Sequence, residues 1–543
     1  MDKLLLSFFY LVLVLLSTHV EKSTSYSIYT GGINVDRYMI SVCKKTPYPD
    51  ICASLAPPTT SSPLSTLDET PLRFRNLALQ ATLTRAEQAR RFISAMKVSP
   101  LSNPAARAAW TDCKELMDDS VSQLSRALSS MKLEDTQTWL SAAVANHETC
   151  RTGFVELNST SFLSSLPFMA TGSNFTKFLS NSLAINNIAG APVSRPTTRK
   201  LLSDGFPEWV SPTERKLLQS GAVLPKADLV VAKDGSGDYK TIAEALAAAA
   251  KTRSGKTAKR FVIYVKSGVY EENVEITKSM KNLMFRGDGI GSTIVTGSRN
   301  VKDGSTTFRS ATVAVSGEGF IARDMTFENT AGSAKGQAVA LRCGADLSIF
   351  YRCSFKGYQD TLYVYSQRQF YRDCDIYGTV DFIFGDAAAV IQNSNIYVRK
   401  PAGKTNTVTA QGRSDPNENT GITVHNSRVT AGSDLKPVLG SVKTYLGRPW
   451  RPYARTVFMK CTLDGLIDPA GWLEWSSKDD LKTLYYGEYL NSGAGAATGN
   501  RVNWPGFHVM STAVATKFTV ENFLSGSSWI RSSGADVPFT SGL

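Results

Sequence analysis

The 543-residue sequence predicts a right-handed parallel β-helix over residues 227–543, preceded by an all-helical domain. Three observations support this. After residue 260, short apolar runs alternate with Gly, Asn and Asp, which indicates many short strands. Within these runs a three-residue pattern recurs at intervals of about 20 residues or more, close to the length of one solenoid turn. Residues 37–190 instead carry apolar positions at helical spacing.

The chain begins with a segment typical of secretion. Met1–Lys3 precede an apolar run from Leu4 to Leu16, and polar residues follow. This is the pattern of a signal peptide, and the run is short for a membrane span. We expect residues 1–25 to be a signal peptide and the remainder to be secreted. An uncleaved signal anchor is the alternative.

Residues 37–190 predict a helical bundle. Helical spacing is clearest in 77–93, 116–131 and 139–145, and Asp112 and Asp135 are expected near helix starts. In an oxidising compartment the four cysteines of this half should form two disulfides, although their spacing leaves the pairing open. They are Cys43, Cys52, Cys113 and Cys150.

Two further features of the first half point to the secretory route. Sequons at Asn158 and Asn174 predict N-glycosylation. Residues 191–226 form a linker rich in Pro and basic residues, and contain the same tetrapeptide twice. A dibasic site in an exposed linker is a natural target for a processing protease, whereas basic linker residues can also be merely solvated. The dibasic residues are Arg199, Lys200, Arg215 and Lys216.

The recurring pattern in the second half is a small or sulfur-containing residue, a polar residue and an apolar residue. Because side chains alternate along a strand, the first and third of each triplet should face the core. A β-sandwich would also have short strands, but not this column of like residues. The triplets start at Met325, Cys353, Cys374, Ser394, Ser427 and Cys461.

Two carboxylates stand out in this half. Asp360 and Asp381 are 21 residues apart, each inside an aromatic and β-branched run. At this spacing they should lie on adjacent rungs, about 4.8 Å apart along the axis. An ionised Asp in such a run is costly unless it is paired or functional. The pair therefore indicates acid–base or nucleophilic chemistry, although Asp also closes turns.

Charge and composition narrow the function. The net charge of +13 suits a polyanionic partner. Nucleic acid is not expected, because no nucleic-acid-binding motif occurs and the chain is predicted to be secreted, so an acidic polysaccharide fits better. A Ser-His-Asp esterase is not expected, because the sequence has no Gly-x-Ser-x-Gly and its four His lie outside the motif segments. No His- or Cys-rich constellation is present, so we expect neither metal nor cofactor.

Four segments carry a family resemblance. Residues 336–342, 358–363, 381–385 and 446–450 resemble, in order and spacing, the signature segments of plant pectin methylesterases. The first half resembles the inhibitor-like pro-region that many of these enzymes carry, a four-helix bundle with two disulfides. The dibasic tetrapeptides resemble the processing motif of that family.

The resemblance implies a reaction and a set of roles. The substrate would be methyl-esterified homogalacturonan of the cell wall, whose galacturonate C6 methyl esters are hydrolysed to methanol and carboxylates. Asp381 would be the nucleophile and Asp360 the acid, then the base. Gln337 and Gln359 would stabilise the oxyanion, and Arg448 would hold the nucleophile ionised. The substrate-binding residues would be Thr307, Gln337, Arg448, Trp450, Tyr358 and Phe382.

Several alternatives remain at this point. The bundle could occupy the groove of its own or another enzyme until it is cleaved, or could only assist folding and sorting. A pectate lyase would need a calcium-binding carboxylate cluster and a polygalacturonase a Gly-His-Gly-like motif, and neither occurs. A catalytically inactive polysaccharide-binding protein is a further possibility. We expect a monomer, which separate inhibitor proteins could also bind.

The chain departs from the family at one position. In the family the column position of Ser394 is usually a Cys bonded to the equivalent of Cys374, so that disulfide cannot form here. Cys374 could be free or could pair with Cys353. We expect free thiols at Cys343, Cys353 and Cys374, whereas the sequence leaves the state of Cys461 open.

Overall fold

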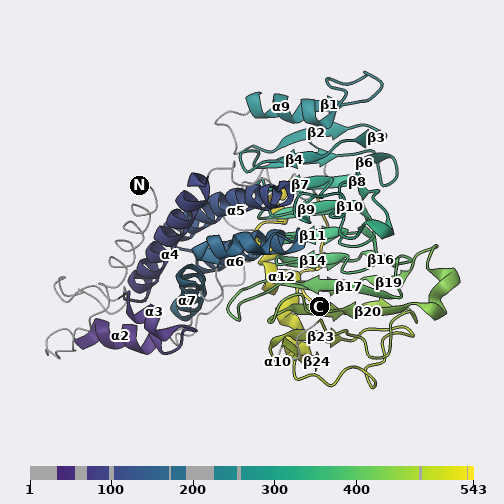
Figure 1. The fold of residues 1–543 in the computed structure, drawn as a ribbon. Helices are drawn as coiled ribbons and strands as arrows, with labels where there is room; N and C mark the ends of the chain where they lie inside the picture. Colours follow the sequence, from purple (N-terminus) through teal and green to yellow (C-terminus); the bar gives the residue numbers. More distant parts are fainter. Residues whose placement is uncertain are drawn as a thin grey trace, which may run out of the picture.

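The computed structural model describes residues 33–55, 70–96, 103–169, 173–190, 225–252, 259–475, 480–534 and 536–543. A helical part lies against one side of a tall stack of strands (Figure 1). The expected signal peptide, residues 1–25, and both dibasic tetrapeptides lie outside these ranges. None of the helices described is both long and apolar enough to cross a membrane.

The helical part is a bundle of four long helices with shorter helices at its end. The long helices are α4 (Thr70–Ala95), α5 (Pro104–Ser129), α6 (Leu133–Glu156) and α7 (Asn174–Ala189). The shorter ones are α2 (Ile33–Cys43), α3 (Pro49–Ala53), η1 (Thr160–Ser165) and η2 (Pro167–Met169). The start of α5 differs from expectation: Asn103 caps it by accepting a hydrogen bond from the Ala105 amide, with Pro104 in the first turn. Asp112 therefore lies inside α5, whereas Asp135 is in the first turn of α6 as expected.

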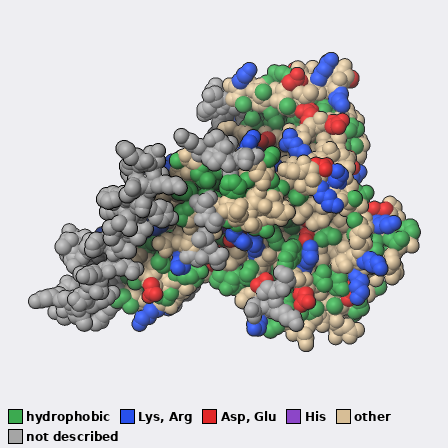
Figure 2. All heavy atoms as spheres, in the orientation of Figure 1, with side chains coloured by type: hydrophobic (Ala, Val, Ile, Leu, Met, Phe, Trp, Pro, Cys, Tyr) green, Lys and Arg blue, Asp and Glu red, His purple; other side chains and the backbone are tan. Residues whose placement is uncertain are grey.

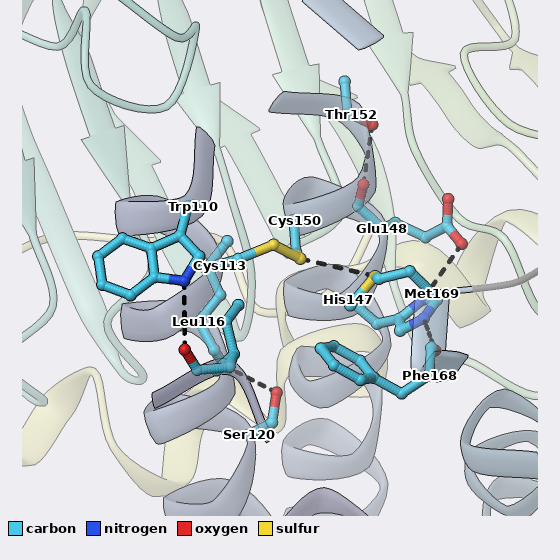
Figure 3. The surroundings of a disulfide bond; sticks show 11 residues. Trp110, Cys113, Leu116, Ser120, His147, Glu148, Cys150, Thr152, Phe168 and Met169 are labelled. Atoms are coloured by element: carbon cyan, nitrogen blue, oxygen red, sulfur yellow. Dashed lines mark hydrogen bonds and ion pairs between the residues drawn. A yellow bond between two sulfur atoms is a disulfide. The ribbon is translucent and has the colours of Figure 1, made fainter. Parts of the chain in front are cut away.

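The four cysteines of the bundle form two disulfides, as predicted. Cys43–Cys52 joins α2 to α3, and Cys113–Cys150 joins α5 to α6. Figure 3 shows Cys113–Cys150 lying between the two helices, with His147 and Met169 beside it. The ring of His147 makes a 3.0 Å hydrogen bond with the carbonyl oxygen of Phe168. The disulfide therefore fixes α5 and α6 side by side.

The second half is a right-handed parallel β-helix in which every strand pairing is parallel. One ladder, a separate seven-stranded sheet, consists of β4 (Val274–Ile276), β7 (Val313–Val315), β9 (Leu341–Cys343), β11 (Leu362–Val364), β14 (Ile383–Gly385), β17 (Thr405–Gln411) and β20 (Lys443–Gly447).

Two further ladders share the strands β8 (Ile321–Asn329) and β10 (Ser348–Lys356). The first adds β1 (Leu229–Val231), β2 (Phe261–Val265), β5 (Leu283–Arg286), β12 (Arg368–Arg372), β15 (Ala388–Gln392), β18 (Gly421–His425), β21 (Arg455–Met459), β23 (Tyr485–Tyr489) and β24 (Phe507–Val509). The second adds β3 (Gly268–Glu271), β6 (Thr293–Gly297), β13 (Asp375–Gly378), β16 (Asn395–Val398), β19 (Arg428–Ala431) and β22 (Thr462–Leu463).

The recurring triplets are confirmed as a core column of the second ladder. Phe327 pairs with Phe355, Phe355 with Ile376 and Ile376 with Ile396, and all four are fully buried. Each triplet follows directly on a residue with left-handed backbone geometry, which turns the chain from one ladder to the next. Because Asn and Asp tolerate this geometry better than most residues, they recur there. The turning residues are Asp324, Arg352, Asp373, Asn393, Asn426 and Lys460.

Ser394 occupies its column position with hydrogen bonds in place of a disulfide. The Cys374 amide donates to Ser394 Oγ at 3.1 Å, and Ser394 Oγ donates to the carbonyl oxygen of Gln392. All four cysteines of the β-helix are buried and unbonded to one another, as predicted for Cys343, Cys353 and Cys374. Burial raises the pKa of the Cys343 thiol to about 11 and that of Cys374 to about 12.

Short helices close and flank the β-helix. α9 (Ile242–Thr252) buries Ile242 and Leu246 at its beginning. The C-terminal segment packs on the first ladder, where Leu524 and Trp529 join the same cluster as Phe370 and Val390. Its elements are α11 (Thr512–Ala515), η5 (Thr516–Phe518), α12 (Val520–Leu524), η6 (Gly526–Ser528) and η7 (Arg531–Ser533). The remaining short helices are η3 (Ser333–Lys335), η4 (Lys436–Ser441) and α10 (Asp480–Thr483).

The bundle lies on the outer face of the seven-stranded sheet. Leu116 of α5 and Phe154 of α6 share one apolar cluster with Phe308, Tyr363 and other residues of that face. Burial of this apolar surface holds the two halves together. The groove of the β-helix therefore lies between the sheet and the helices α5 and α6.

We predict that four thiols per chain react with a thiol reagent in denaturant without reductant, because four of the eight cysteines are bonded. In the native protein few should react, since all four thiols are buried and protonated at neutral pH. Prior reduction is the control and should give eight. A count of two or fewer in unreduced, unfolded protein would contradict the free thiols at Cys353 and Cys374.

Candidate active site

A cavity of about 270 Å³ lies between the bundle and the seven-stranded sheet. It brings together most of the residues that the sequence singled out, although they come from five separate segments. The predicted residues in its lining are Thr307, Gln337, Gln359, Asp360, Asp381, Arg448 and Trp450. The bundle contributes Asp112, Thr149, Thr152, Gly153 and Glu156.

Asp360 and Asp381 lie on adjacent rungs, as their spacing predicted. Leu362 pairs with Ile383 in the parallel ladder β11–β14, and each Asp stands two residues before its partner in that pair. The Asp360 amide also donates to the carbonyl oxygen of Val380 at 3.1 Å. Both aspartates have left-handed backbone geometry, with φ of 62° and 52°. Such geometry at two non-glycine residues is uncommon and concentrates at functional sites.

Asp381 is paired with a guanidinium and a threonine hydroxyl. Arg448 donates two hydrogen bonds to it, from Nε at 2.8 Å and from Nη2 at 2.6 Å. Thr407 Oγ1 donates a third, at 2.5 Å, to the oxygen that Nε also contacts. A two-point guanidinium pair is among the strongest arrangements for a carboxylate, and it fixes the orientation of the group.

The carboxyl group of Asp360, unlike that of Asp381, is buried without a partner in the described part of the chain. Its side chain is 7 % exposed, and its carboxyl group has no hydrogen-bond partner among the residues described. Burial, then the negative charges of Asp381 and Glu156, raise the pKa of Asp360 well above its ordinary value, against a smaller opposing effect of Arg448. Of the two carboxyl groups, Asp360 is therefore the one whose neutral form the site favours.

Two amides and a threonine complete the polar part of the cavity. Gln337 and Gln359 are half-buried and precede the neighbouring strands β9 and β11; the Ala338 amide donates to the carbonyl oxygen of Gln359 at 3.2 Å. Among the described residues, no group donates to or accepts from either side-chain amide. Both amides are thus available to a ligand in the cavity. Thr307 lies nearby, and its backbone amide donates to Glu156 of the bundle.

The aromatic side of the cavity contains one predicted residue and others that the sequence did not reveal. Trp450 packs edge-on against Tyr363 and Phe384, which stack on each other at 4.1 Å between ring centroids. The Arg448 guanidinium lies 4.0 Å above the ring of Trp475. Trp475 and Thr407 lie far from the motif segments, so only the fold brings them to Arg448 and Asp381.

The structure corrects two predicted substrate-binding residues. Phe382 is fully buried in the β-helix core, packed against Gly378, whose hydrogen leaves the space that its ring occupies. Tyr358 lies beneath Arg399, which donates to its hydroxyl at 2.6 Å and stacks on its ring. Neither side chain lines the cavity, because the left-handed turn at Asp381 breaks the alternation and places Phe382 in the core, and Arg399 holds Tyr358 aside.

Glu156, in the last turn of α6, covers the pair of aspartates. Its carboxylate accepts a 3.0 Å hydrogen bond from the Thr307 amide. Burial raises its pKa, an effect that the Thr307 hydrogen bond opposes. Glu148 and Thr152, on the same helix, bind Arg451 of the β-helix. α6 therefore closes the cavity with polar contacts as well as apolar ones.

The predicted glycosylation sites lie away from this cavity, and both Asn158 and Asn174 are exposed. Within the described ranges, no group of three or more His, Cys, Asp or Glu side chains could hold a metal ion.

Comparisons with known proteins match both halves of the chain. The family described as "Pectinesterase" matches residues 228–527, and that described as "Plant invertase/pectin methylesterase inhibitor" matches residues 38–185. The chain is 56 % identical to probable pectinesterase/pectinesterase inhibitor 17 of Arabidopsis thaliana, over 92 % of this chain and 94 % of that protein. Pectinesterase 2 of Citrus sinensis is 53 % identical over 93 % and 94 %. The solved structure of pectin methylesterase from carrot superposes with a TM-score of 0.57 and 56 % identity, covering 59 % of this chain and all of that one.

We predict that Asp360→Asn raises the midpoint of thermal unfolding by about 2 °C or more at pH 7.5, with a smaller gain at pH 4. The pKa of Asp360 is raised in the fold, so between the unfolded and folded pKa values the native state binds more protons than the unfolded state. Stability is therefore lost as the pH rises through that window, and a neutral Asn avoids the loss. Scanning calorimetry at both pH values measures the difference.

Asp381→Asn is the matched control for this measurement. It should lower the midpoint at pH 7.5, because Arg448 loses its charged partner in a largely buried site. An Asp360→Asn variant that melts at or below the wild-type temperature at pH 7.5 would show that Asp360 is not a neutral acid in the native protein.

Proposed function

This chain belongs to the pectinesterase family, and we propose that Asp381 and Asp360 divide between them the chemistry of its reaction. The protein is a carboxylic ester hydrolase that removes methyl esters from pectin, and it carries an inhibitor-like helical domain in front of the catalytic β-helix. The observation that supports the division of roles is the contrast between Asp381, which is paired with Arg448, and the unpaired Asp360, whose pKa is raised.

In the first step, Asp381 attacks the C6 carbonyl carbon of a methyl-esterified galacturonate. Negative charge develops on the carbonyl oxygen, where the amides of Gln337 and Gln359 can donate hydrogen bonds. As the tetrahedral intermediate collapses, Asp360 gives its proton to the departing methoxide, and methanol leaves. The product is an anhydride between Asp381 and C6.

In the second step, Asp360, now a carboxylate, removes a proton from water, which attacks the anhydride. The C6 carboxylic acid is released and loses its proton to solvent, Asp381 is regenerated as a carboxylate, and Asp360 again holds a proton. Arg448 neutralises Asp381 before and after the reaction. Trp450 would pack on a sugar ring at the edge of the cavity.

The helical domain is autoinhibitory in this arrangement. Glu156 and Gly153 of α6 line the cavity that holds both aspartates, so a polysaccharide must displace α6 to reach them. We propose that the chain is secreted to the cell wall as a glycosylated monomer and that a protease cleaves the linker at one of the dibasic sites. The same domain in another protein, or a separate inhibitor protein, could bind this groove in the same manner.

We predict that residues 225–543 release methanol from methyl-esterified homogalacturonan without shortening the polymer. Asp381→Ala should lower kcat by about four orders of magnitude or more. Gln337→Ala should lower it by about 10²- to 10³-fold. Methanol release is measured by a coupled alcohol oxidase assay, and polymer length by size-exclusion chromatography. Chain shortening would favour a lyase or a glycosidase, and an active Asp381→Ala variant would exclude Asp381 as the nucleophile.

We predict a lower specific activity for the full chain than for residues 225–543, because α5 and α6 cover the groove. As a control, the fragment is also assayed with an equimolar amount of an unrelated helical protein, so that both assays contain a helical domain. Equal specific activities of the full chain and the fragment would contradict the autoinhibitory role. Folding or sorting would then remain as the role of the bundle.

A further inference from the structure

We propose that Arg309, with Lys278 and Arg342, forms a subsite that binds free carboxylates of already de-esterified galacturonates next to the ester being cleaved. Three carboxylates of α5 occupy this cationic subsite when the bundle is in place. The inference rests on the proposed function, because it assigns a substrate preference to the same groove.

The cations lie in the groove, on the first rungs before the catalytic pair. Arg309 follows directly on Thr307 and Phe308, which line the catalytic cavity. Arg342 is in β9, and Lys278 follows β4. In the order β4, β7, β9, β11, the strand β4 lies three rungs, or about 14 Å, from the strand that follows Asp360. One extended polymer in the groove could therefore touch the catalytic aspartates and these cations together.

Successive carboxylates along α5 of the bundle bind the cations of this subsite. Arg309 Nε donates to Asp112 at 2.6 Å, and Arg309 Nη2 binds Glu115. Lys278 Nζ lies 2.7 Å from Asp119. These acidic residues are three and four positions apart on α5, so they form one stripe on the helix. α5 thus presents a row of carboxylates, as a de-esterified galacturonan does.

Little else in the described part of the chain neutralises these cations. Besides the bundle carboxylates, Arg309 has only Glu275 as an acidic neighbour, at 4.0 Å. Arg342 is buried, and among the described residues its guanidinium donates to no hydrogen-bond acceptor; it stacks on Phe308 at 3.5 Å from the ring centroid. Burial and the neighbouring Arg309 lower the pKa of Arg342. When the bundle leaves, the groove keeps a concentrated positive charge, which favours an anionic ligand.

The same place has room for a ligand group. A second cavity of about 20 Å³ is lined by Arg342, Lys278, Glu115 and Asp119, large enough for one water molecule. Elsewhere the basic surplus is dispersed: Figure 2 shows Lys and Arg side chains in small groups interspersed with Asp and Glu on the face in view. The overall charge of +13 alone would attract any polyanion, whereas Arg309 fixes where a carboxylate binds relative to the catalytic pair.

The test uses residues 225–543, because the carrot enzyme, all of which corresponds to 59 % of this chain, folds without a helical domain. Initial rates of methanol release are measured on fully methyl-esterified and on half-de-esterified homogalacturonan of equal length. The readout is the ratio of kcat/KM on the second substrate to that on the first. We expect Arg309→Gln to lower this ratio by about tenfold, and Lys278→Gln to lower it in the same direction.

Lys517→Gln is the matched control. It removes one positive charge from an exposed residue of η5, in the C-terminal segment outside the groove, and should leave the ratio unchanged. The ratio of the wild-type fragment should also fall with added salt, since screening weakens an ionic contact. Lys278→Gln keeps the proposal testable if Arg309→Gln does not fold.

The outcomes separate this proposal from the proposed function. If the wild-type fragment releases no methanol from either substrate, the esterase assignment itself fails. If it releases methanol but Arg309→Gln and Lys278→Gln keep the wild-type ratio, the subsite is wrong and the esterase assignment stands. If Lys517→Gln lowers the ratio of kcat/KM values as much as Arg309→Gln does, the effect depends only on the net charge of the protein. That result would likewise contradict the proposed subsite.

Discussion

The in-register stacking of β9, β11 and β14 is the constraint on which the site depends. Parallel rungs repeat at about 4.8 Å, so residues at the same register position are brought to that spacing whatever their chemistry. Here the position two residues before the Leu362–Ile383 pair holds an aspartate on both rungs. Two carboxylates this close in a buried groove cannot both remain ionised at low cost. The fold therefore favours one shared proton on this pair of carboxyl groups. The surrounding residues determine which of the two groups holds it.

Arg448 and Thr407 favour the placement of this proton on Asp360. Both donate to Asp381, and neither donates to Asp360. Trp475 lies under the guanidinium and keeps it partly out of water, so the ion pair is stronger than an exposed one would be. The asymmetry between two chemically identical side chains thus arises from three residues on other rungs and loops.

The sequence predicted the repeating parts of the structure well, because repetition is visible in one dimension. The core column, the rung spacing of the two aspartates and the disulfide-bonded bundle followed from periodicity, and the family motifs located Gln337, Gln359, Arg448 and Trp450. Contacts that depend on docking could not be predicted. Asp112 was expected near a helix start, yet it lies inside α5 and binds Arg309 of the other half. Nothing near Trp475 or Glu156 in the sequence indicated the groove, and Phe382 was misplaced because the left-handed turn at Asp381, which directs it into the core, is not visible in the sequence.

The apolar cluster that the bundle shares with the seven-stranded sheet has a consequence for solubility. Phe308, Tyr363, Phe384 and Val339 lie on the outer face of the sheet and are kept from water by helices that cleavage would remove. A contiguous aromatic strip of this kind promotes self-association when it is bare. On the proposal that the bundle is cleaved after secretion, the newly made protein would keep this face covered until it reaches the polysaccharide that can replace the helices. The timing of cleavage would then govern the colloidal behaviour of the enzyme as well as its activity.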